Sequence, residues 1–318
     1  MKMVVMDGHA LNPGDLSWEA LGALGDLTVF DRTEQEDLAV ERIGDAEILI
    51  INKFPVTASL LDRCPSVKAI FVLATGYNVV DCRAAKARGI PVCNVPAYGT
   101  AAVAQFTFGL ILTLCHRIEL HSHSVRQMDW TNGPDFCYWL TPQTELAGKT
   151  LGIIGFGRIG RAVGKIAKAF GMRVLAYSRS ECEEGRAIGE YVSLEALLAQ
   201  SDIITLHCPM TAETEHIIRE ETISKMKDGV MLVNTARGQL IKDADLADAL
   251  KSGKLRGAAL DVVSVEPIQR DNPLLGCENC ILTPHIAWAP AESRRRLMNA
   301  VVENVRCWMN GTPRNVVN

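Results

Sequence analysis

The sequence predicts an α/β fold made of two doubly wound parallel sheets, and three observations lead to that class. Short β-rich runs alternate with helical patterns through most of the chain, which is typical of parallel sheets covered by helices. The alternation stops before a long apolar segment and restarts near residue 150, so we expect two sheets. The length of 318 residues, of which 48% are hydrophobic and 22% charged, is enough for two separate cores.

The first sheet is expected within the first hundred residues. Its predicted strands are Met3–Met6, Leu27–Phe30, Ile48–Ile51, Ala69–Leu73 and Pro91–Cys93. The stretches Thr33–Ile43 and Val80–Ala87 lie between strands and have helical patterns, so they would cover this sheet. Together these elements predict one small doubly wound domain.

A long apolar helix is expected to follow. The segment Ala101–Leu120 is apolar nearly all round, which predicts a helix packed between two domains rather than on a surface. Its apolar run is shorter than the roughly 20 residues that a membrane span needs. An aromatic-rich stretch, Trp130–Trp139, comes next and contains Gly133 and Pro134.

The second sheet begins after this connection. Its predicted strands are Thr150–Ile154, Arg173–Tyr177, Ile203–Leu206, Val230–Asn234, Gly257–Leu260 and Cys280–Thr283, with helices between them. The chain closes with a helical segment from about Pro290 to Asn310, which Gly311 and Pro313 terminate. This last helix could cap either domain.

Charge and cysteine content restrict the compartment and the partners. The net charge is −4 and the longest basic run is Arg294–Arg296, so the positive surface expected of a nucleic-acid-binding protein is absent. The apolar stretch Met1–Met6 is too short for a signal peptide. Ten scattered cysteines lack the spacing of a disulfide framework. We expect a cytoplasmic protein that binds neither nucleic acid nor membranes.

A glycine-rich turn predicts a dinucleotide site. The motif Gly-x-Gly-x-x-Gly stands directly after a predicted strand and opens a helix with one apolar face. Its first glycine permits the tight turn, its second lets the backbone approach a pyrophosphate, and its third lets helix and strand pack closely. The alternative is an ordinary glycine-rich turn of an α/β sheet. The predicted contacts are Gly155, Phe156, Gly157, Arg158, Ile159 and Gly160.

The residues after the next strand favour NADP(H). Sites for NAD carry an acidic residue roughly 20 residues beyond the glycine turn, where it accepts hydrogen bonds from the adenosine ribose. Here the chain reads Ser178-Arg179-Ser180, which offers hydroxyl groups and a guanidinium for a 2′-phosphate. The alternative is that Arg179 is a solvated surface charge and that NAD(H) binds as well.

Three candidate catalytic residues follow strands of the second sheet. Arg237, Glu266 and His285 each come a few residues after a predicted strand, and ligands of open α/β sheets bind at that end. Reduction of a 2-oxo acid needs a group that holds the carboxylate or carbonyl oxygen, which suits Arg237. It also needs a proton donor, which suits His285 beside a carboxylate.

Each of these residues, taken alone, has a structural explanation. Arg237 could form a surface ion pair, Glu266 could be a loop carboxylate, and His285 could be a core residue beside a helix. Their shared position beside the glycine turn favours catalysis. Cys277-x-x-Cys280 is a lone cysteine pair without a histidine at zinc spacing, so no metal site is expected.

The sequence resembles the D-isomer-specific 2-hydroxyacid dehydrogenases. The matching segments are Leu73–Asp81, Gly152–Gly160, Leu206–Pro209, Val233–Gly238, Ala259–Val262, Glu266–Pro267 and Thr283–His285, which span the chain. Within the family, Asp7–Gly14 and Asp135–Trp139 are most similar to glycerate dehydrogenases, also called hydroxypyruvate reductases. The departure from the family pattern is Ser178, which replaces the common acidic residue.

The resemblance implies roles for particular residues. Arg237, Glu266 and His285 would be the catalytic set, and Asp261 would line the nicotinamide pocket. The substrate would be bound by Ala74, Thr75, Gly76, Arg237 and His285, the first three around its carboxylate. Further cofactor contacts would be His207, Cys208, Pro209, Thr214, Thr235, Ala236, Arg237, Asp261, His285 and Ala287.

The resemblance also implies a split layout. A Rossmann-type NAD(P)-binding domain of residues 99–287 would be inserted in a flavodoxin-like substrate-binding domain of residues 1–98 plus 288–318, with the active site in the cleft between them. Homodimerisation through Ala101–Leu120 would be usual in such a family.

The expected function is the reduction of a small 2-oxo acid, hydroxypyruvate or glyoxylate, to the D-2-hydroxy acid. NAD(P)H would donate the hydride, with NADP(H) favoured, and His285 would donate the proton. The alternatives are a dehydrogenase of the D-lactate or phosphoglycerate type, or a non-catalytic, dinucleotide-sensing protein similar to corepressors. The complete catalytic set favours an enzyme.

Overall fold

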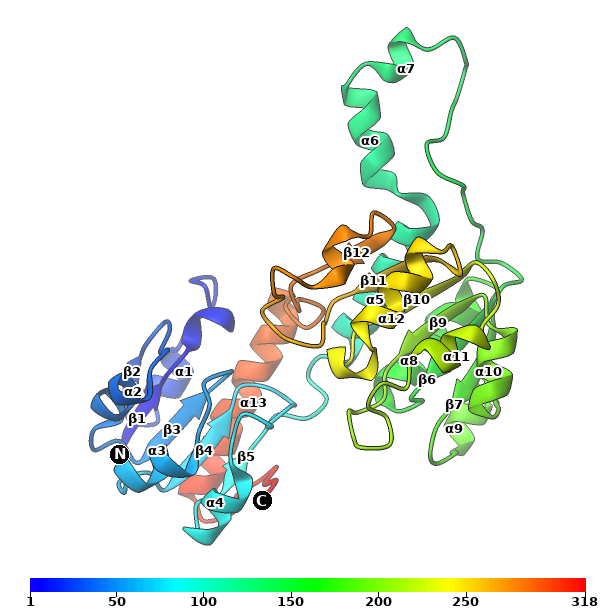
Figure 1. The fold of residues 1–318 in the computed structure, drawn as a ribbon. Helices are drawn as coiled ribbons and strands as arrows, with labels where there is room; N and C mark the ends of the chain where they lie inside the picture. The colour runs from blue at the N-terminus through cyan, green and yellow to red at the C-terminus, as the bar shows by residue number, and fades with distance from the viewer. The chain divides into compact units, whose positions relative to one another are not determined.

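The computed structural model describes residues 1–318, and the chain divides into two compact units (Figure 1). Unit 1 comprises Met1–Gly99 with Trp288–Asn318, and unit 2 comprises Thr100–Ala287. Each unit is built on its own parallel sheet covered by helices, which confirms the predicted α/β class. No single helix is long and apolar enough to cross a membrane.

Unit 1 has five parallel strands in the order β2-β1-β3-β4-β5. The strands are β1 (Lys2–Val5), β2 (Asp26–Val29), β3 (Ile48–Ile51), β4 (Ala69–Val72) and β5 (Val92–Cys93). The helices are η1 (Gly8–Ala10), α1 (Glu19–Gly22), α2 (Glu36–Ile43), α3 (Ala58–Arg63), α4 (Cys82–Ala87) and α13 (Ala291–Met309). All residues of β3 and β4 are buried and alternate between two apolar clusters, because both faces of the sheet are covered.

The C-terminal helix α13 covers one face of this first sheet. Leu297 and Val301 join the apolar cluster around Phe71, so the end of the chain returns to the first sheet. The largely buried guanidinium of Arg294 donates to both carboxylate oxygens of Asp15, at 2.7 and 2.6 Å. This bidentate ion pair lowers the pKa of Asp15 and fixes the start of α13 to the N-terminal segment.

Unit 2 has seven parallel strands in the order β12-β11-β10-β9-β6-β7-β8. The strands are β6 (Thr150–Ile154), β7 (Arg173–Tyr177), β8 (Glu190–Tyr191), β9 (Ile203–Leu206), β10 (Val230–Asn234), β11 (Leu255–Leu260) and β12 (Cys280–Leu282). The helices are α5 (Thr100–His116), α6 (Ile118–Arg126), α7 (Asp129–Asn132), α8 (Arg158–Ala169), α9 (Glu183–Arg186), α10 (Leu194–Gln200), α11 (Glu220–Ser224), η2 (Gly238–Leu240), α12 (Asp243–Lys251) and η3 (Pro273–Gly276).

Every predicted strand is present, with small shifts at its ends. The helix predicted from Val80 begins instead at Cys82, because the carboxylate of Asp81 accepts the backbone N–H of Ala84 at 2.8 Å and caps the helix there. The strand β8 escaped prediction, since a strand of two residues produces no periodic pattern.

The segment predicted as one helix over Ala101–Leu120 is two helices. Arg117 has a left-handed backbone with φ of 44°, which ends α5, and α6 leaves at 55° to it. The apolar face of α5 packs on α8 and on the sheet of unit 2. Residues 117–143, which we call the arm, contain α6 and α7 and project away from the rest of unit 2 (Figure 1).

Candidate functional site

The turn between β6 and α8 has the geometry that its glycines predict. Gly155 has φ of +96°, and a Cβ there would collide with the backbone of Cys208. A Cβ on Gly160 would collide with the carbonyl oxygen of Gly155, because helix and strand pack closely. Around Gly157, in contrast, no heavy atom lies within 4 Å of the corresponding position. This open space fits a pyrophosphate that approaches the backbone.

The N-terminus of α8 supplies the donors for that pyrophosphate. The helix begins at Arg158. Its N-cap residue is Gly157, which has no side chain to accept a hydrogen bond from the first N–H groups. Its first N–H groups and its dipole therefore favour an anion. The side chain of Phe156 is only 2% exposed and meets Tyr191 edge-on, with ring centroids 5.6 Å apart. Phe156 thus contributes its side chain to the core and only its backbone to the turn.

The three polar residues after β7 face solvent. Ser178 is half-buried, and Arg179 and Ser180 are exposed. The pKa of Glu213 is lowered mainly by the hydrogen bond from Thr211, and the nearby Arg179 guanidinium adds to this effect. Arg179 is nevertheless exposed at this strand end, where a guanidinium can bind a ligand phosphate.

The loop after β9 contains a buried imidazole. His207 has no hydrogen-bond partner at either ring nitrogen, and burial lowers its pKa to about 3, so the ring is neutral at pH 7. Burial raises the pKa of the neighbouring Cys208 to about 11, so this thiol is protonated at pH 7. The hydroxyl of Thr214 donates to the carbonyl of Pro209 at 2.7 Å and closes the loop.

The turn after β10 holds Arg237. The side chain of Asn234 donates to the carbonyl of Arg237 at 2.8 Å and accepts the N–H of Ala236 at 2.9 Å. The hydroxyl of Thr235 lies 3.0 Å from that of Thr107 in α5, which ties the turn to the helix. The Arg237 guanidinium donates to the Ala236 carbonyl at 2.6 Å and has no carboxylate partner. A half-buried guanidinium held in this way can bind a substrate anion.

His285 and Glu266 form a pair at the same edge of the sheet. Nδ1 of His285 lies 2.7 Å from Oε2 of Glu266, and the two side chains are 27% and 36% exposed. The carboxylate orients the imidazole ring through Nδ1, as in general acid–base pairs. The partly exposed ring remains within reach of a ligand.

Asp261 organises the loop that presents His285. Its carboxylate accepts the hydroxyl of Thr283 at 2.6 Å and the backbone N–H groups of Ile286 and Ala287 at 2.9 and 2.8 Å. Burial, at 1% exposure, raises the pKa of this carboxyl group. The bonds hold His285 in a left-handed conformation with φ of 55°.

The predicted substrate loop, Ala74–Gly76, follows β4 in unit 1. The hydroxyl of Thr75 donates to the carbonyl of Val95 at 2.7 Å, and Asn94 donates its side-chain amide to the Thr75 carbonyl at 2.7 Å. The backbone N–H groups of Thr75 and Gly76 donate to no backbone carbonyl of the chain. Two adjacent donors on a fixed loop fit a carboxylate.

Comparison with known proteins identifies the family. The family model for the D-isomer specific 2-hydroxyacid dehydrogenase, NAD binding domain, matches residues 108–287, which is more than half of the chain. The chain belongs to the D-isomer-specific 2-hydroxyacid dehydrogenases. It is therefore an NAD(P)-dependent oxidoreductase, and the matched NAD-binding region lies within unit 2.

Relatives of this dehydrogenase match over both units. A hydroxypyruvate reductase of Blautia hydrogenotrophica is 53% identical over 322 residues, covering 100% of both chains. A glycerate dehydrogenase of Methylorubrum extorquens is 43% identical over 290 residues, covering 91% of this chain and 90% of its own. A solved structure of an acyclic imino acid reductase in complex with NADPH and D-Arg matches with a TM-score of 0.86 and 31% identity, covering 100% of both chains.

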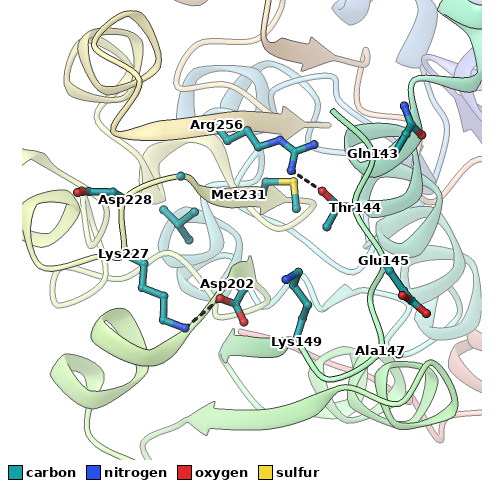
Figure 2. A pocket seen from close by; sticks show the side chains of 12 residues that line it. Gln143, Thr144, Glu145, Ala147, Lys149, Asp202, Lys227, Asp228, Met231 and Arg256 are labelled. Atoms are coloured by element: carbon teal, nitrogen blue, oxygen red, sulfur yellow. Dashed lines mark hydrogen bonds and ion pairs between the residues drawn. The ribbon is translucent and has the colours of Figure 1, made fainter. Parts of the chain in front are cut away.

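A cavity of about 430 Å³ in the dehydrogenase lies at the other edge of the same sheet (Figure 2). It is lined by residues that precede β6 and β9 and by residues around the starts of β10 and β11. The glycine turn and His285, in contrast, come after the ends of strands. Lys227 and Asp202 form an ion pair across it at 2.9 Å. Arg256 donates to the hydroxyl of Thr144 and, at 2.5 Å, to the carbonyl of Pro142. Lys227, Asp202 and Arg256 are thus engaged by other groups of the chain, whereas Lys149 and Glu145, which also line the cavity, form no ion pair.

The structure brings Glu266, His285 and the supporting Asp261 together and places Arg237 on the neighbouring turn, while Ala74–Gly76 belong to unit 1. Five residues that support these turns through hydrogen bonds were not predicted from the sequence: Asn234, Gln239, Asp243, Ser264 and Asn272. A polar residue at the end of a buried strand was a usable signal for Asn234. The others had none, because their hydrogen bonds join residues distant in the sequence.

Proposed function

We propose that this dehydrogenase reduces a small 2-oxo acid, hydroxypyruvate or glyoxylate, to the D-2-hydroxy acid with NADPH. The observation that carries the proposal is the His285–Glu266 pair, 2.7 Å apart, at the sheet edge that also carries an arginine without a carboxylate partner. The relatives named hydroxypyruvate reductase and glycerate dehydrogenase support this class of substrate.

In the proposed reaction His285 delivers the proton. Its Nδ1 is hydrogen-bonded to Glu266, so Nε2 would donate to the carbonyl oxygen of the substrate as that oxygen gains charge. Arg237 would bind the substrate through the carboxylate or the carbonyl oxygen and stabilise the developing charge. When bound, the reduced nicotinamide supplies the hydride to the carbonyl carbon.

We assign substrate binding to residues 1–98 plus 288–318 and cofactor binding to residues 99–287. The N–H groups of Thr75 and Gly76, which donate to no backbone carbonyl, would hold the substrate carboxylate. The open backbone around Gly157 and the uncapped start of α8 would hold the pyrophosphate. Asp261 would support the nicotinamide pocket through the loop that it organises.

We propose NADPH rather than NADH as the preferred cofactor. Ser178 takes the place of an acidic residue that would repel a 2′-phosphate, and Arg179 supplies an exposed guanidinium that would bind one.

The direct test is turnover of purified protein with NADPH or NADH and a panel of 2-oxo acids, followed by the loss of reduced-nicotinamide absorbance. We expect the highest kcat/KM with hydroxypyruvate or glyoxylate and NADPH. Ser178→Asp should move the preference toward NADH, because a carboxylate there repels the phosphate and accepts the ribose hydroxyls. No turnover with any acid would refute the proposal.

We also propose a homodimer formed through the arm. Its side chains Phe136, Trp139 and Ile118 are 92%, 68% and 66% exposed, which is unusual for large apolar groups in a monomer. The predicted dimer region Ala101–Leu120 overlaps the arm only at its end. Light scattering should give twice the chain mass, and Phe136→Asp with Ile118→Asp should give monomers.

The ten free cysteines suit the cytoplasm that we propose as the compartment.

A further inference from the structure

The loops that carry Arg237 and Glu266 are joined at one residue, Ser264. The side-chain amide of Gln239, two residues after Arg237, donates to the backbone carbonyl of Ser264 at 2.8 Å. The hydroxyl of Ser264, two residues before Glu266, donates to Oδ2 of Asp243 at 2.6 Å. Ser264 is therefore held through both its main chain and its side chain.

Asp243 holds the loop of Glu266 at both ends. The same carboxylate oxygen that accepts the Ser264 hydroxyl also accepts the side-chain amide of Asn272 at 2.8 Å. The loop between these two residues contains Glu266. Asp243 stands in the first turn of α12, where the helix dipole favours its negative charge. The anchor is therefore a rigid helix start of the sheet domain rather than another loop.

The two loops also touch through their backbones. A Cβ on Gly238, which follows Arg237, would overlap the carbonyl group of Val263. The backbone N–H of Val263 in turn points to Oε1 of Glu266, at 3.4 Å. The Glu266 loop therefore packs directly on the turn that bears Arg237.

We propose that Ser264, held by Gln239 and Asp243, is a positioning residue that fixes Glu266 against His285. This inference rests on the proposed function, because it assigns no new reacting group. Ser264 acts only through Glu266: it keeps the carboxylate at hydrogen-bond distance from Nδ1 of the imidazole. We call the bonds of Ser264 to Gln239 and Asp243 the clamp. Loss of the clamp should weaken proton delivery while leaving the binding of the 2-oxo acid nearly unchanged.

Ser264→Ala removes the hydroxyl, and Ser264→Thr is the matched control that keeps it. We expect Ser264→Ala to lower kcat for reduction about three- to tenfold, the effect of one hydrogen bond, with KM for the 2-oxo acid changed less than twofold. The pH at which kcat/KM for reduction falls to half should move to a lower value, because a less constrained carboxylate supports the protonated imidazole less well. Ser264→Thr should retain both values.

A double variant separates positioning from general destabilisation. In a Glu266→Gln background the addition of Ser264→Ala should not move the pH profile further, because the group that Ser264 positions has lost its charge. Gln239→Met, which keeps the length of the side chain but removes the amide, should behave like Ser264→Ala. Circular dichroism melting of each variant checks that the fold is intact.

The outcomes distinguish this inference from the proposed function. If Glu266→Gln and His285→Ala abolish most turnover but Ser264→Ala leaves kcat and the pH profile unchanged, the clamp is refuted and the function stands. If Ser264→Ala lowers kcat without any shift in the pH profile, its role is only structural and the inference is also refuted. If Glu266→Gln and His285→Ala retain normal turnover, the proposed function itself fails.

Discussion

The two edges of the seven-stranded sheet use charge in opposite ways. At the edge where strands begin, Lys227 pairs with Asp202, and Arg256 is engaged by a hydroxyl and a carbonyl (Figure 2). At the edge where strands end, Arg237 is held only by a backbone carbonyl, and the carboxylate of Glu266 is bonded to Nδ1 of His285. Both edges are polar, so polarity alone does not mark the site. What marks it is a guanidinium without an ion pair on the turn beside a hydrogen-bonded imidazole and carboxylate.

Matched substitutions of one arginine at each edge give the largest expected contrast. Arg237→Gln should lower kcat for 2-oxo acid reduction by about 10²- to 10³-fold, the effect of removing one donor from a developing oxyanion. Arg256→Gln should change kcat by less than about threefold, because its partners belong to the arm and the segment behind it. Steady-state kinetics measures both, and equal losses would contradict the assignment of the site to one edge.

A second pair of arginines tests the cofactor end of the site. Arg179→Ala should raise KM for NADPH about tenfold and leave KM for NADH unchanged, because a charge-assisted bond to the 2′-phosphate is lost. Arg186→Ala is the control, since that guanidinium is exposed and paired with Glu181 at 2.9 Å. An unchanged NADPH preference in the first variant would show that Arg179 is only a solvated charge.

The buried His207 affects stability rather than rate. Burial lowers its folded pKa to about 3, below the ordinary value of 6.5, so the unfolded chain binds the extra proton between these two values. Its contribution to the free energy of unfolding is complete above pH 6.5 and falls as the pH drops toward 3. The slope is at most about 1.4 kcal/mol per pH unit.

Denaturant unfolding between pH 7 and 4 measures this slope. His207→Leu should flatten the dependence of stability on pH, whereas His123→Leu, on the exposed arm, should not. An identical slope in the wild type and His207→Leu would mean that the imidazole is accessible to protons in the folded state.

The sequence predicted the fold class and the strands because each strand is a local apolar run with a turn signal. It also predicted the glycine turn. A Cβ at Gly155 or Gly160 would collide with backbone atoms, so both positions require glycine and the motif can be recognised in the sequence. The break at Arg117 could not be foreseen, because no glycine or proline marks that left-handed residue. The clamp on Ser264 was equally hidden, since its bond to Asp243 joins residues 21 apart.

The candidate catalytic residues were found for a topological reason. Parallel strands place their carboxyl ends at one edge, so Glu266 and His285 were expected near each other, and the structure places them 2.7 Å apart.

The most direct test of the central claim is the rate of hydroxypyruvate reduction by His285→Ala at saturating NADPH, with cofactor binding measured separately by fluorescence. The claim that His285 delivers the proton predicts a loss of about 10²- to 10⁴-fold in kcat with a far smaller change in the Kd for NADPH. A variant that binds NADPH normally and turns over at the wild-type rate would contradict it.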